Sequence, residues 1–380
     1  MIGFDVVRPT FAQIDLDTLR ENYRAIREFV SGERGTQPEL IAVVKANAYG
    51  HGLVPVARAL EGAGATMVAC ADIEEGVQLR EGGVRAQILV FGALSISDLN
   101  GVFEYDLTPT VSSPSAARAL QAAAAARAVR LHCHLKIDTG MNRFGFRYDN
   151  LRSMMPEVLG NPQLVFDAVY THFATAEDST DPLFVKQCER FSAARETLTS
   201  LGLGGVRCHA ANSAALLAGR TCWHDAVRPG LLLYGVPPPD VVVPGALRVK
   251  PVMSLRSRVV AVKGMRAGET TGYGARFTAQ RPTRVAVVPA GYADGLDYRL
   301  SGIGEVLIRG RRAPIVGSVC MDSITIDVTD VDAEPDDEVV VIGSQEGDQI
   351  DVSEVARWTG TVPHAVLCRT GSRIERVYAA

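Results

Sequence analysis

Short apolar runs alternate with amphipathic segments through most of the first 235 residues. The expected strands are 41–45, 66–71, 88–92, 107–111, 131–137, 167–173, 206–210 and 226–235. Helical spacing of apolar residues marks the segments 17–30, 54–61, 74–81, 115–129 and 183–201. Eight strand and helix units in alternation predict an α/β protein with a parallel (β/α)8 barrel of the TIM type, because a doubly wound sheet usually has fewer units.

The alternation stops at three consecutive prolines, Pro237 to Pro239, which fit neither a helix interior nor a central strand. Short alternating runs follow, punctuated by Gly, Pro and Asp, at 252–263, 284–288, 305–309, 313–328 and 338–342. This pattern is typical of a mostly β domain. We therefore expect a barrel over residues 12–238 and a β-rich C-terminal domain over 239–380, with an N-terminal strand in residues 1–11 packing on the second domain.

Composition narrows the class of protein. Of the 380 residues, 47% are hydrophobic and 6% aromatic, which is typical of a globular enzyme with an aliphatic core. A formal net charge of -4 gives no reason to expect a nucleic acid or membrane partner. Neither a transmembrane run nor a signal-peptide pattern is present, and the seven cysteines contain no C-x-x-C pair. We expect reduced thiols and a cytoplasmic location.

Lys45 ends the first apolar run, Ile41 to Val44, and therefore stands at the tip of a buried strand. Burial lowers the pKa of a lysine and makes its amine a usable nucleophile or base. Lys45 is thus a candidate for a Schiff base. The simpler alternative is a lysine whose ammonium group reaches solvent from the strand end.

Other polar residues also fall at the carboxyl ends of the expected strands, where the active site of a β/α barrel is built. They are Lys136 and Asp138 in the fifth strand, His172 in the sixth, Asn212 and Ser213 after the seventh, and Arg228 in the eighth. In the fifth strand, strict alternation places His132, His134, Lys136 and Asp138 on one face. For each histidine taken singly, a hydrogen-bonded polar core is the favoured interpretation.

The segment after the seventh strand has features of an anion site. Ser213 precedes a helical run, so that it could lie at a helix N-terminus with free backbone N–H groups. Gly230 follows the eighth strand, and the loops after strands seven and eight are the usual phosphate site of this fold. A phosphate-bearing cofactor is one hypothesis, and an ordinary N-cap is the other.

Several motifs together resemble those of the alanine racemase family. Val44-Lys45-Ala46-Asn47-Ala48-Tyr49-Gly50-His51-Gly52 is similar to its pyridoxal-phosphate signature. The other matching motifs follow in the family's order: 136–145, 171–174, 212–213, 228–230, 272–274, 291–295 and 320–322. The resemblance implies pyridoxal 5'-phosphate as cofactor, a homodimer with shared active sites, and interconversion of L- and D-alanine, which supplies D-alanine for peptidoglycan.

The resemblance also implies roles for individual residues. Lys45 would carry the cofactor and act as the base on one face, and Tyr273 of the partner subunit would act on the other face with His172 as its hydrogen-bond partner. The residues implied to bind the cofactor are Lys45, Tyr49, Arg143, Asn212, Ser213, Arg228, Gly230, Leu231 and His364. Arg228 would face the pyridine nitrogen.

Substrate contacts and a modification follow from the same resemblance. Arg143 and the backbone of Met321 would meet the substrate carboxylate, and Tyr292 would line the entry. Lys136 resembles a lysine that is carbamylated in the family, giving an anion that orients Arg143. By themselves, the motifs around Tyr273, Tyr292 and Met321 are ordinary turns.

One position departs from the family pattern. His364 stands where a tyrosine is expected, near the cofactor phosphate and the substrate side chain. Because histidine is smaller and titrates near neutrality, the pocket could admit a larger or polar substrate such as serine. The alternative is that histidine and tyrosine are interchangeable there.

Three other classes of protein share part of this pattern. A single-barrel pyridoxal-phosphate carrier and a decarboxylase would both share Lys45, but the motifs at Tyr273 and Met321 argue against them. A metal-dependent hydrolase would use His132, His134 and a carbamylated Lys136. These three residues lie on one strand with no further ligand set, so we expect no metal.

Overall fold

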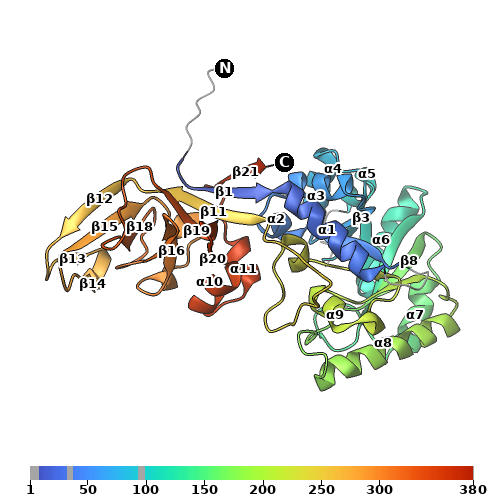
Figure 1. The fold of residues 1–380 in the computed structure, drawn as a ribbon. Helices are drawn as coiled ribbons and strands as arrows, with labels where there is room; N and C mark the ends of the chain where they lie inside the picture. Colours follow the sequence, from blue (N-terminus) through green and yellow to red (C-terminus); the bar gives the residue numbers. More distant parts are fainter. Residues whose placement is uncertain (1–7, 32–36, 93–98, 380) are drawn as a thin grey trace, which may run out of the picture. The chain divides into compact units, whose positions relative to one another are not determined.

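The computed structural model describes residues 8–31, 37–92 and 99–379. The chain forms two compact units (Figure 1). The barrel unit comprises Leu19–Ala48 and Leu53–Val249, and the β unit comprises the N-terminal residues through Thr18, Tyr49–Gly52 and the chain from Lys250. The contacts thus divide the chain at residue 249, whereas the proline run had placed the division at 238.

The barrel unit contains a closed ring of eight parallel strands, as predicted. They are β2 (Glu39–Val43), β3 (Met67–Cys70), β4 (Gln87–Val90), β5 (Thr108–Val111), β6 (Leu131–Asp138), β8 (Leu164–Tyr170), β9 (Arg207–His209) and β10 (Ala226–Val227). Pairing of β10 with β2 and of β5 with β6 closes the ring. A short strand, β7 (Phe146–Arg147), adds to β6. Closure gives each of the eight barrel strands a neighbour on both sides.

Helices separate successive barrel strands (Figure 1). They are α1 (Leu16–Val30), α3 (Leu53–Gly62), α4 (Ile73–Glu81), α5 (Asn100–Glu104), α6 (Pro114–Ala126), α7 (Leu151–Leu159), α8 (Pro182–Ser200) and α9 (Ser213–Ala218). Local sequence signals begin the longer ones. Ser113 caps α6 and Asp181 caps α8, each followed by a proline at the first helical position, where its missing N–H costs nothing. No helix in the described ranges is long and apolar enough to cross a membrane.

The ends of several expected strands are wrong. The run 226–235 is a strand only at β10, because Pro229 has no N–H to donate and residues 231–234 form the 3-10 helix η2 (Leu231–Tyr234). Arg228 therefore follows the eighth strand instead of lying in it. His172 lies two residues beyond β8, and Lys45 lies two residues beyond β2 at the start of α2 (Lys45–Tyr49).

The β unit is built mainly on a seven-stranded sheet. Its strands are β1 (Phe11–Asp15), β11 (Met253–Arg258), β16 (Glu305–Ile308), β17 (Arg311–Pro314), β19 (Glu338–Gln345), β20 (Asp348–Ile350) and β21 (Glu375–Ala379). A second sheet joins β12 (Ala261–Met265), β15 (Thr283–Val288) and β18 (Ile324–Asp327), and β13 (Thr270–Thr271) pairs with β14 (Phe277–Thr278). The expected run 252–263 is thus two strands in different sheets.

The position of β1 and two short helices complete the description of the β unit. The strand β1 lies between β11 and β21, so the strand near the N-terminus belongs to this unit, and residues 1–7 lie outside the described residues. The helices α10 (Val352–Trp358) and α11 (Pro363–Cys368) precede β21. The motifs around Tyr273 and Tyr292 occupy the short 3-10 turns η3 (Tyr273–Ala275) and η4 (Tyr292–Asp294).

Candidate active site

Arg228 is a buried cation held by neutral groups. Its Nη1 donates to Nδ1 of His209 at 2.8 Å, and its Nη2 donates to the carbonyl oxygens of Thr171 and Ala210, each at 2.8 Å. Nη2 also lies 3.4 Å from Nδ1 of His172. Burial lowers the pKa of Arg228 to about 10, so the guanidinium stays protonated at neutral pH. Among the described residues, no carboxylate forms an ion pair with it.

The hydrogen bonds fix the tautomers of two histidines in series. Because a guanidinium only donates, Nδ1 of His209 must accept, and its proton must be on Nε2. That Nε2–H points at Nδ1 of His134, 3.0 Å away, which leaves the proton of His134 on its own Nε2. Burial lowers the pKa of His134 to about 4 and that of His209 well below its usual value, so both rings are neutral. The ring of His209 also stacks on Tyr170 at 4.7 Å.

Lys136 lies at the same end of the barrel, with only 6% of its surface exposed. Its Nζ is 5.5 Å from the ring centroids of both Phe144 and Tyr170. Burial, followed by the charges of Arg143 and Arg228, lowers the pKa of Lys136 to about 8. A sizeable fraction of this lysine is therefore a neutral amine near pH 8, which is the form that reacts with electrophiles such as carbon dioxide.

Asp138 shapes the loop that carries Arg143. Its Oδ1 accepts from the backbone N–H groups of Gly140 and Asn142, each at 3.0 Å. A Cβ at Gly145 would lie 2.8 Å from the backbone nitrogen of Asp138, so the loop returns closely against the strand end. Arg143 itself is exposed, with Cζ 5.8 Å from the ring centroid of Phe144. The loop thus fixes the backbone of Arg143 and leaves its guanidinium accessible.

His172 is half-buried and held through its backbone. Burial, followed by the charges of Arg228 and Lys136, keeps the pKa of His172 well below its usual value, so it is a neutral acceptor or donor. Nε2 of Gln187 in α8 donates to the carbonyl oxygen of His172 at 3.0 Å and to Oγ1 of Thr139 at 3.1 Å. Gln187 is a positioning residue that the sequence analysis missed, because nothing in the sequence distinguishes it from other glutamines on a helix.

Ser213 joins the loops that follow the seventh and eighth strands. Asn212 is the N-cap of α9, since its Oδ1 accepts from the backbone N–H of Ala215 at 2.9 Å. Ser213 is the first helical residue, and its buried Oγ accepts from the backbone N–H groups of Gly230 at 2.9 Å and Leu232 at 3.4 Å. The N-cap interpretation is therefore correct for Asn212. The hydroxyl of Ser213 thus ties the start of α9 to the backbone of residues 230–232.

Four consecutive residues after Lys45 have left-handed backbone conformation. The φ angles of Ala46, Asn47, Ala48 and Tyr49 lie between 52° and 55°. Such a conformation costs roughly 1–2 kcal/mol per non-glycine residue, so it persists only where surrounding contacts enforce it. Ala48 N–H donates to the carbonyl oxygen of Val44 at 2.7 Å, and Oδ1 of Asn47 accepts from Leu53 N–H at 2.8 Å. The turn fixes where Lys45 leaves the barrel strand.

The segment Tyr49–Gly52 is fastened within the β unit. The ring of Tyr49 lies 5.7 Å from the ring of His364, measured between centroids. The carbonyl oxygen of Gly50 accepts from Nε of Arg376 at 2.7 Å. A Cβ at Gly50 would lie 2.3 Å from the carbonyl oxygen of Leu367, and its φ is 81°, so only glycine fits. His364, the residue that departs from the family pattern, is thus next to Tyr49.

The three turn motifs of the β unit come together. Oγ of Ser318 donates to the carbonyl oxygen of Tyr273 at 2.9 Å, and the backbone N–H of Tyr292 donates to Cys320 at 3.0 Å. The carbonyl oxygen of Met321 accepts from the backbone N–H of Ala293 at 3.0 Å. The side chains remain exposed: 78% for Tyr273, 52% for Met321 and 45% for Tyr292. We call these three exposed side chains, whose turns are joined through residues 318–321, the tyrosine cluster.

His132 is separate from His134. It is exposed at the amino end of β6, where its Nδ1 lies 3.0 Å from the carboxylate of Asp167. Asp167 is the extra residue of a bulge in β8 opposite Cys133 and His134. In the part of the chain that the structure describes, no three His, Cys, Asp or Glu side chains gather as metal ligands. His132 and His134, which had suggested a metal-dependent hydrolase, therefore contact different residues.

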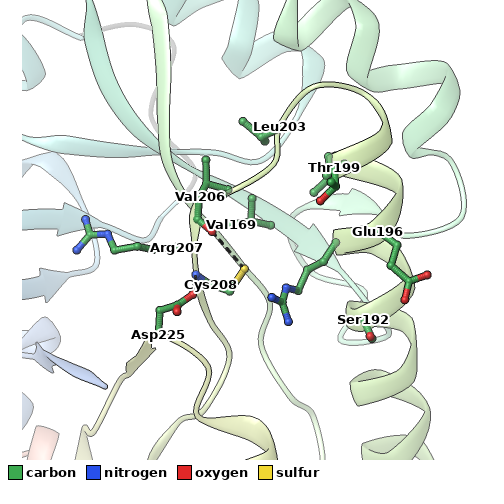
Figure 2. Close-up of a pocket in the computed structure, with 12 residues that line it drawn as sticks. Val169, Ser192, Glu196, Thr199, Leu203, Val206, Arg207, Cys208 and Asp225 are labelled. Carbon is green, nitrogen blue, oxygen red and sulfur yellow. Dashed lines mark hydrogen bonds between the residues drawn. The ribbon is translucent and has the colours of Figure 1, made fainter. Parts of the chain in front are cut away.

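A pocket of about 680 Å³ lies elsewhere on the barrel unit. Figure 2 shows its lining, from Ser192, Glu196 and Thr199 of α8 and from the segment leading into β9. The lining residues Val206, Arg207 and Cys208 belong to the amino end of that strand, whereas the expected site residues follow the carboxyl ends. None of the site residues expected from the sequence lines this pocket.

Comparisons with known proteins cover nearly the whole chain. Residues 14–238 match the alanine racemase N-terminal domain, and residues 252–378 match the C-terminal domain. The alanine racemase of Desulforamulus reducens is 40% identical over 372 residues, which are 97% of this chain and 99% of that protein. This likeness is far above what a shared fold alone would give.

Solved structures are similar over the same extent. Alanine racemase from a D-cycloserine-producing Streptomyces lavendulae has a TM-score of 0.92 and 33% identity, covering 99% of this chain and 98% of that one. Alanine racemase from Bartonella henselae, described with covalently bound pyridoxal phosphate, has a TM-score of 0.86 and 30% identity, covering 98% of this chain and 100% of that one.

Proposed function

The chain belongs to the alanine racemase family and interconverts L- and D-alanine, and from this premise we propose that it does so with pyridoxal 5'-phosphate bound through Lys45. One electrostatic observation carries the proposal. Burial is the main cause of the lowered pKa of Lys136 and His172, and the ammonium group of Lys45 contributes to both. Lys45 thus shares one site with the residues at the carboxyl ends of the barrel strands.

The residues of this site fit the cofactor's chemistry. Among the described residues, Nε of Arg228 has no hydrogen-bond acceptor, so it can donate to a pyridine nitrogen. The hydroxyl of Ser213 and the backbone around Gly230 and Leu231 are our candidates to bind the phosphate group, and we assign Asn212 and Tyr49 to the same group from the family resemblance alone. Lys45 supplies the amine that an aldehyde requires. When bound, pyridoxal phosphate supplies an electron sink for the α-carbon.

Racemisation requires that a proton leave one face of the α-carbon and that another arrive at the opposite face. We assign the amine of Lys45 to one face and the phenol of Tyr273 to the other. His172 is neutral and is our candidate to hydrogen-bond the phenol. Arg143, whose guanidinium is accessible, binds the substrate carboxylate together with the backbone of Met321, and Tyr292 lines the entry. Carbamylated Lys136 would be an anion that orients Arg143.

Arg228 controls the reaction without transferring a proton. With a pKa of about 10 it stays protonated at neutral pH, so it would donate a hydrogen bond to the ring nitrogen of the bound cofactor without readily protonating it. A ring nitrogen left unprotonated would make the cofactor a weaker electron sink, which would limit side reactions such as transamination. Arg228→Glu should therefore form pyridoxamine phosphate, and no change in side products would count against this role.

Tyr273 is proposed to act in the partner subunit of a homodimer. The tyrosine cluster is exposed on the isolated chain, and apolar clusters of this kind mark surfaces that are covered in an assembly. An active site shared between two subunits would explain why Tyr273, the proposed second base, lies on an exposed turn of the β unit. The product D-alanine is an expected precursor of peptidoglycan, and we expect neither nucleic acid nor membrane as a partner.

Subunit mixing tests the shared site. Lys45→Ala should lose the absorbance band of bound cofactor that shifts with D- or L-alanine, and Tyr273→Phe should keep the band and lose racemisation. In a mixture of the two inactive variants, half of the dimers are mixed and one of their two sites is intact, so about a quarter of wild-type activity should return. No recovery after confirmed subunit exchange would show that each site uses one chain.

A further inference from the structure

Two cysteines of the barrel unit face each other. Sγ of Cys188, on the long helix α8, lies 3.6 Å from Sγ of Cys222, although the residues are 34 positions apart. Cys222 ends the 3-10 turn η1 (Arg220–Cys222) and is buried, whereas Cys188 is partly exposed. The pair lies outside the proposed active site, and the racemase reaction uses neither thiol.

The pair combines a nucleophile with a second thiol within its reach. The contact between the two thiols lowers the pKa of one and raises that of the other, so one sulfur ionises more readily than an isolated buried thiol would. Oγ1 of Thr221 also lies 3.8 Å from Sγ of Cys222. Because the thiolate is the reactive form of cysteine and either sulfur can be the donor, whichever thiol reacts first has the other placed to follow.

We propose that Cys188 and Cys222 are a redox modification site, which a peroxide converts reversibly to a disulfide. One of the two sulfurs, as thiolate, attacks a peroxide oxygen, the O–O bond breaks, and hydroxide leaves, which forms a sulfenic acid. The second thiol then attacks the sulfur of the sulfenic acid, so that the S–S bond forms, the S–O bond breaks, and the hydroxyl group leaves as water with the proton of the second thiol. The two sulfurs lose two electrons, and the peroxide gains them.

Bond formation requires the sulfurs to approach by about 1.5 Å, because an S–S bond is close to 2.05 Å long. The movement falls on the η1 side, since α8 is a helix of 19 residues and η1 has only three. Gly219, which precedes η1, has nothing within 4 Å of the position of a Cβ. The residue that precedes the short turn is therefore not packed against other atoms at its Cβ position.

The disulfide would fasten two elements that position the active site. On one side, Gln187 precedes Cys188 in α8 and holds the carbonyl oxygen of His172. On the other side, Nε1 of Trp223 donates to the carbonyl oxygen of Leu216 in α9, the helix that begins at Ser213. The bond closes a loop of 34 residues, so we expect the oxidised holoenzyme to unfold roughly 5 °C higher than the reduced one.

Peptide mass spectrometry of the holoenzyme after brief exposure to a small excess of hydrogen peroxide tests the site. We expect a cross-linked pair of peptides containing residues 188 and 222 with a loss of two hydrogens, and dithiothreitol should reverse both the cross-link and the rise in Tm. Cys188→Ser and Cys222→Ser should each abolish them. Cys368→Ser, which removes an exposed thiol elsewhere, should leave the cross-link in place.

The opposing outcomes are equally distinct. Thiols that stay unmodified, a sulfinic acid on either cysteine without a cross-link, or a cross-link of either residue to a different cysteine would each overturn the proposal. The wild-type measurement with peroxide and dithiothreitol needs no substitution, so it decides the question even if a serine variant folds poorly.

Discussion

Replacing His209 tests whether the position of Arg228 depends on its hydrogen bond to this histidine. His209→Leu removes the acceptor 2.8 Å from Nη1 of Arg228 and the donor 3.0 Å from His134, while it keeps apolar bulk against Tyr170. A hydrogen bond to a charged group contributes about 1.5–3 kcal/mol, and an unsatisfied buried polar atom costs about 1–3 kcal/mol. We expect the free energy of unfolding to fall by about 3–5 kcal/mol, or Tm by about 10 °C.

Two further variants separate the two hydrogen bonds. His209→Asn puts a carboxamide oxygen near the position of Nδ1 and keeps the acceptor for Arg228, while the donor to His134 is lost. His209→Gln reaches the position of Nε2 and keeps the contact with His134, while Arg228 loses its acceptor. If Arg228 must be held for catalysis, kcat/KM should fall about 100-fold in the Gln and Leu variants and less than 10-fold in the Asn variant.

The assay is kcat/KM in both directions of racemisation, together with thermal unfolding of the holoenzyme. Stability should follow the number of hydrogen bonds retained, so the Leu variant should be the least stable and the Asn and Gln variants intermediate. Equal activity of the Gln and Asn variants would refute the reasoning, because it would mean that Arg228 keeps its place without His209.

Three further outcomes can be measured. His134 has a pKa of about 4 in the folded state and about 6.5 in the unfolded state, so folding favours its neutral form. Its contribution to the free energy of unfolding is complete above pH 6.5. We expect roughly 3 kcal/mol of that free energy to be lost as pH falls to 4. Chemical denaturation should show this loss in the wild type and a flatter profile in His134→Asn; equal profiles would contradict it. His364→Tyr should lower the serine-to-alanine ratio of kcat/KM, and an unchanged ratio would mean that the two residues are interchangeable. Because the pKa of Lys136 is about 8, a carbamate signal in ¹³C NMR with labelled bicarbonate should grow as pH rises through 8 and be absent in Lys136→Arg; a signal that persists there belongs to another amine.

The barrel could be predicted from the sequence because its strands are short buried runs between helices with clear caps. The ends of the strands could not. Pro229 stops β10 after two residues, yet the apolar run continues to Tyr234 because η2 is buried as well. In the same way, nothing in Ala46 to Tyr49 signals a left-handed turn, since these residues carry none of the glycines that usually mark one.

The grouping of the candidate site residues could be predicted in part. Arg228, His172 and Lys136 have residue types and strand-end positions that indicate function, and the structure brings them together. The role of His209 was not predictable, because its contact with Arg228 depends on the pairing of β9 with β10, in which His209 lies opposite Ala226. Register between neighbouring strands is the information that a single sequence does not carry.

The charges of the proposed site predict how a bound ligand affects the stability of the barrel unit. Arg143, Arg228 and Lys45 all lower the pKa of Lys136 after burial has done so, and Asp138 is the only carboxylate that acts in the opposite direction among the main causes. Oδ1 of Asp138 is already engaged by two backbone N–H groups. Cations held this close repel one another and oppose folding. A phosphate group, a substrate carboxylate or a carbamate on Lys136 would each add negative charge beside them. Ligand binding should therefore stabilise the barrel unit as well as complete its active site.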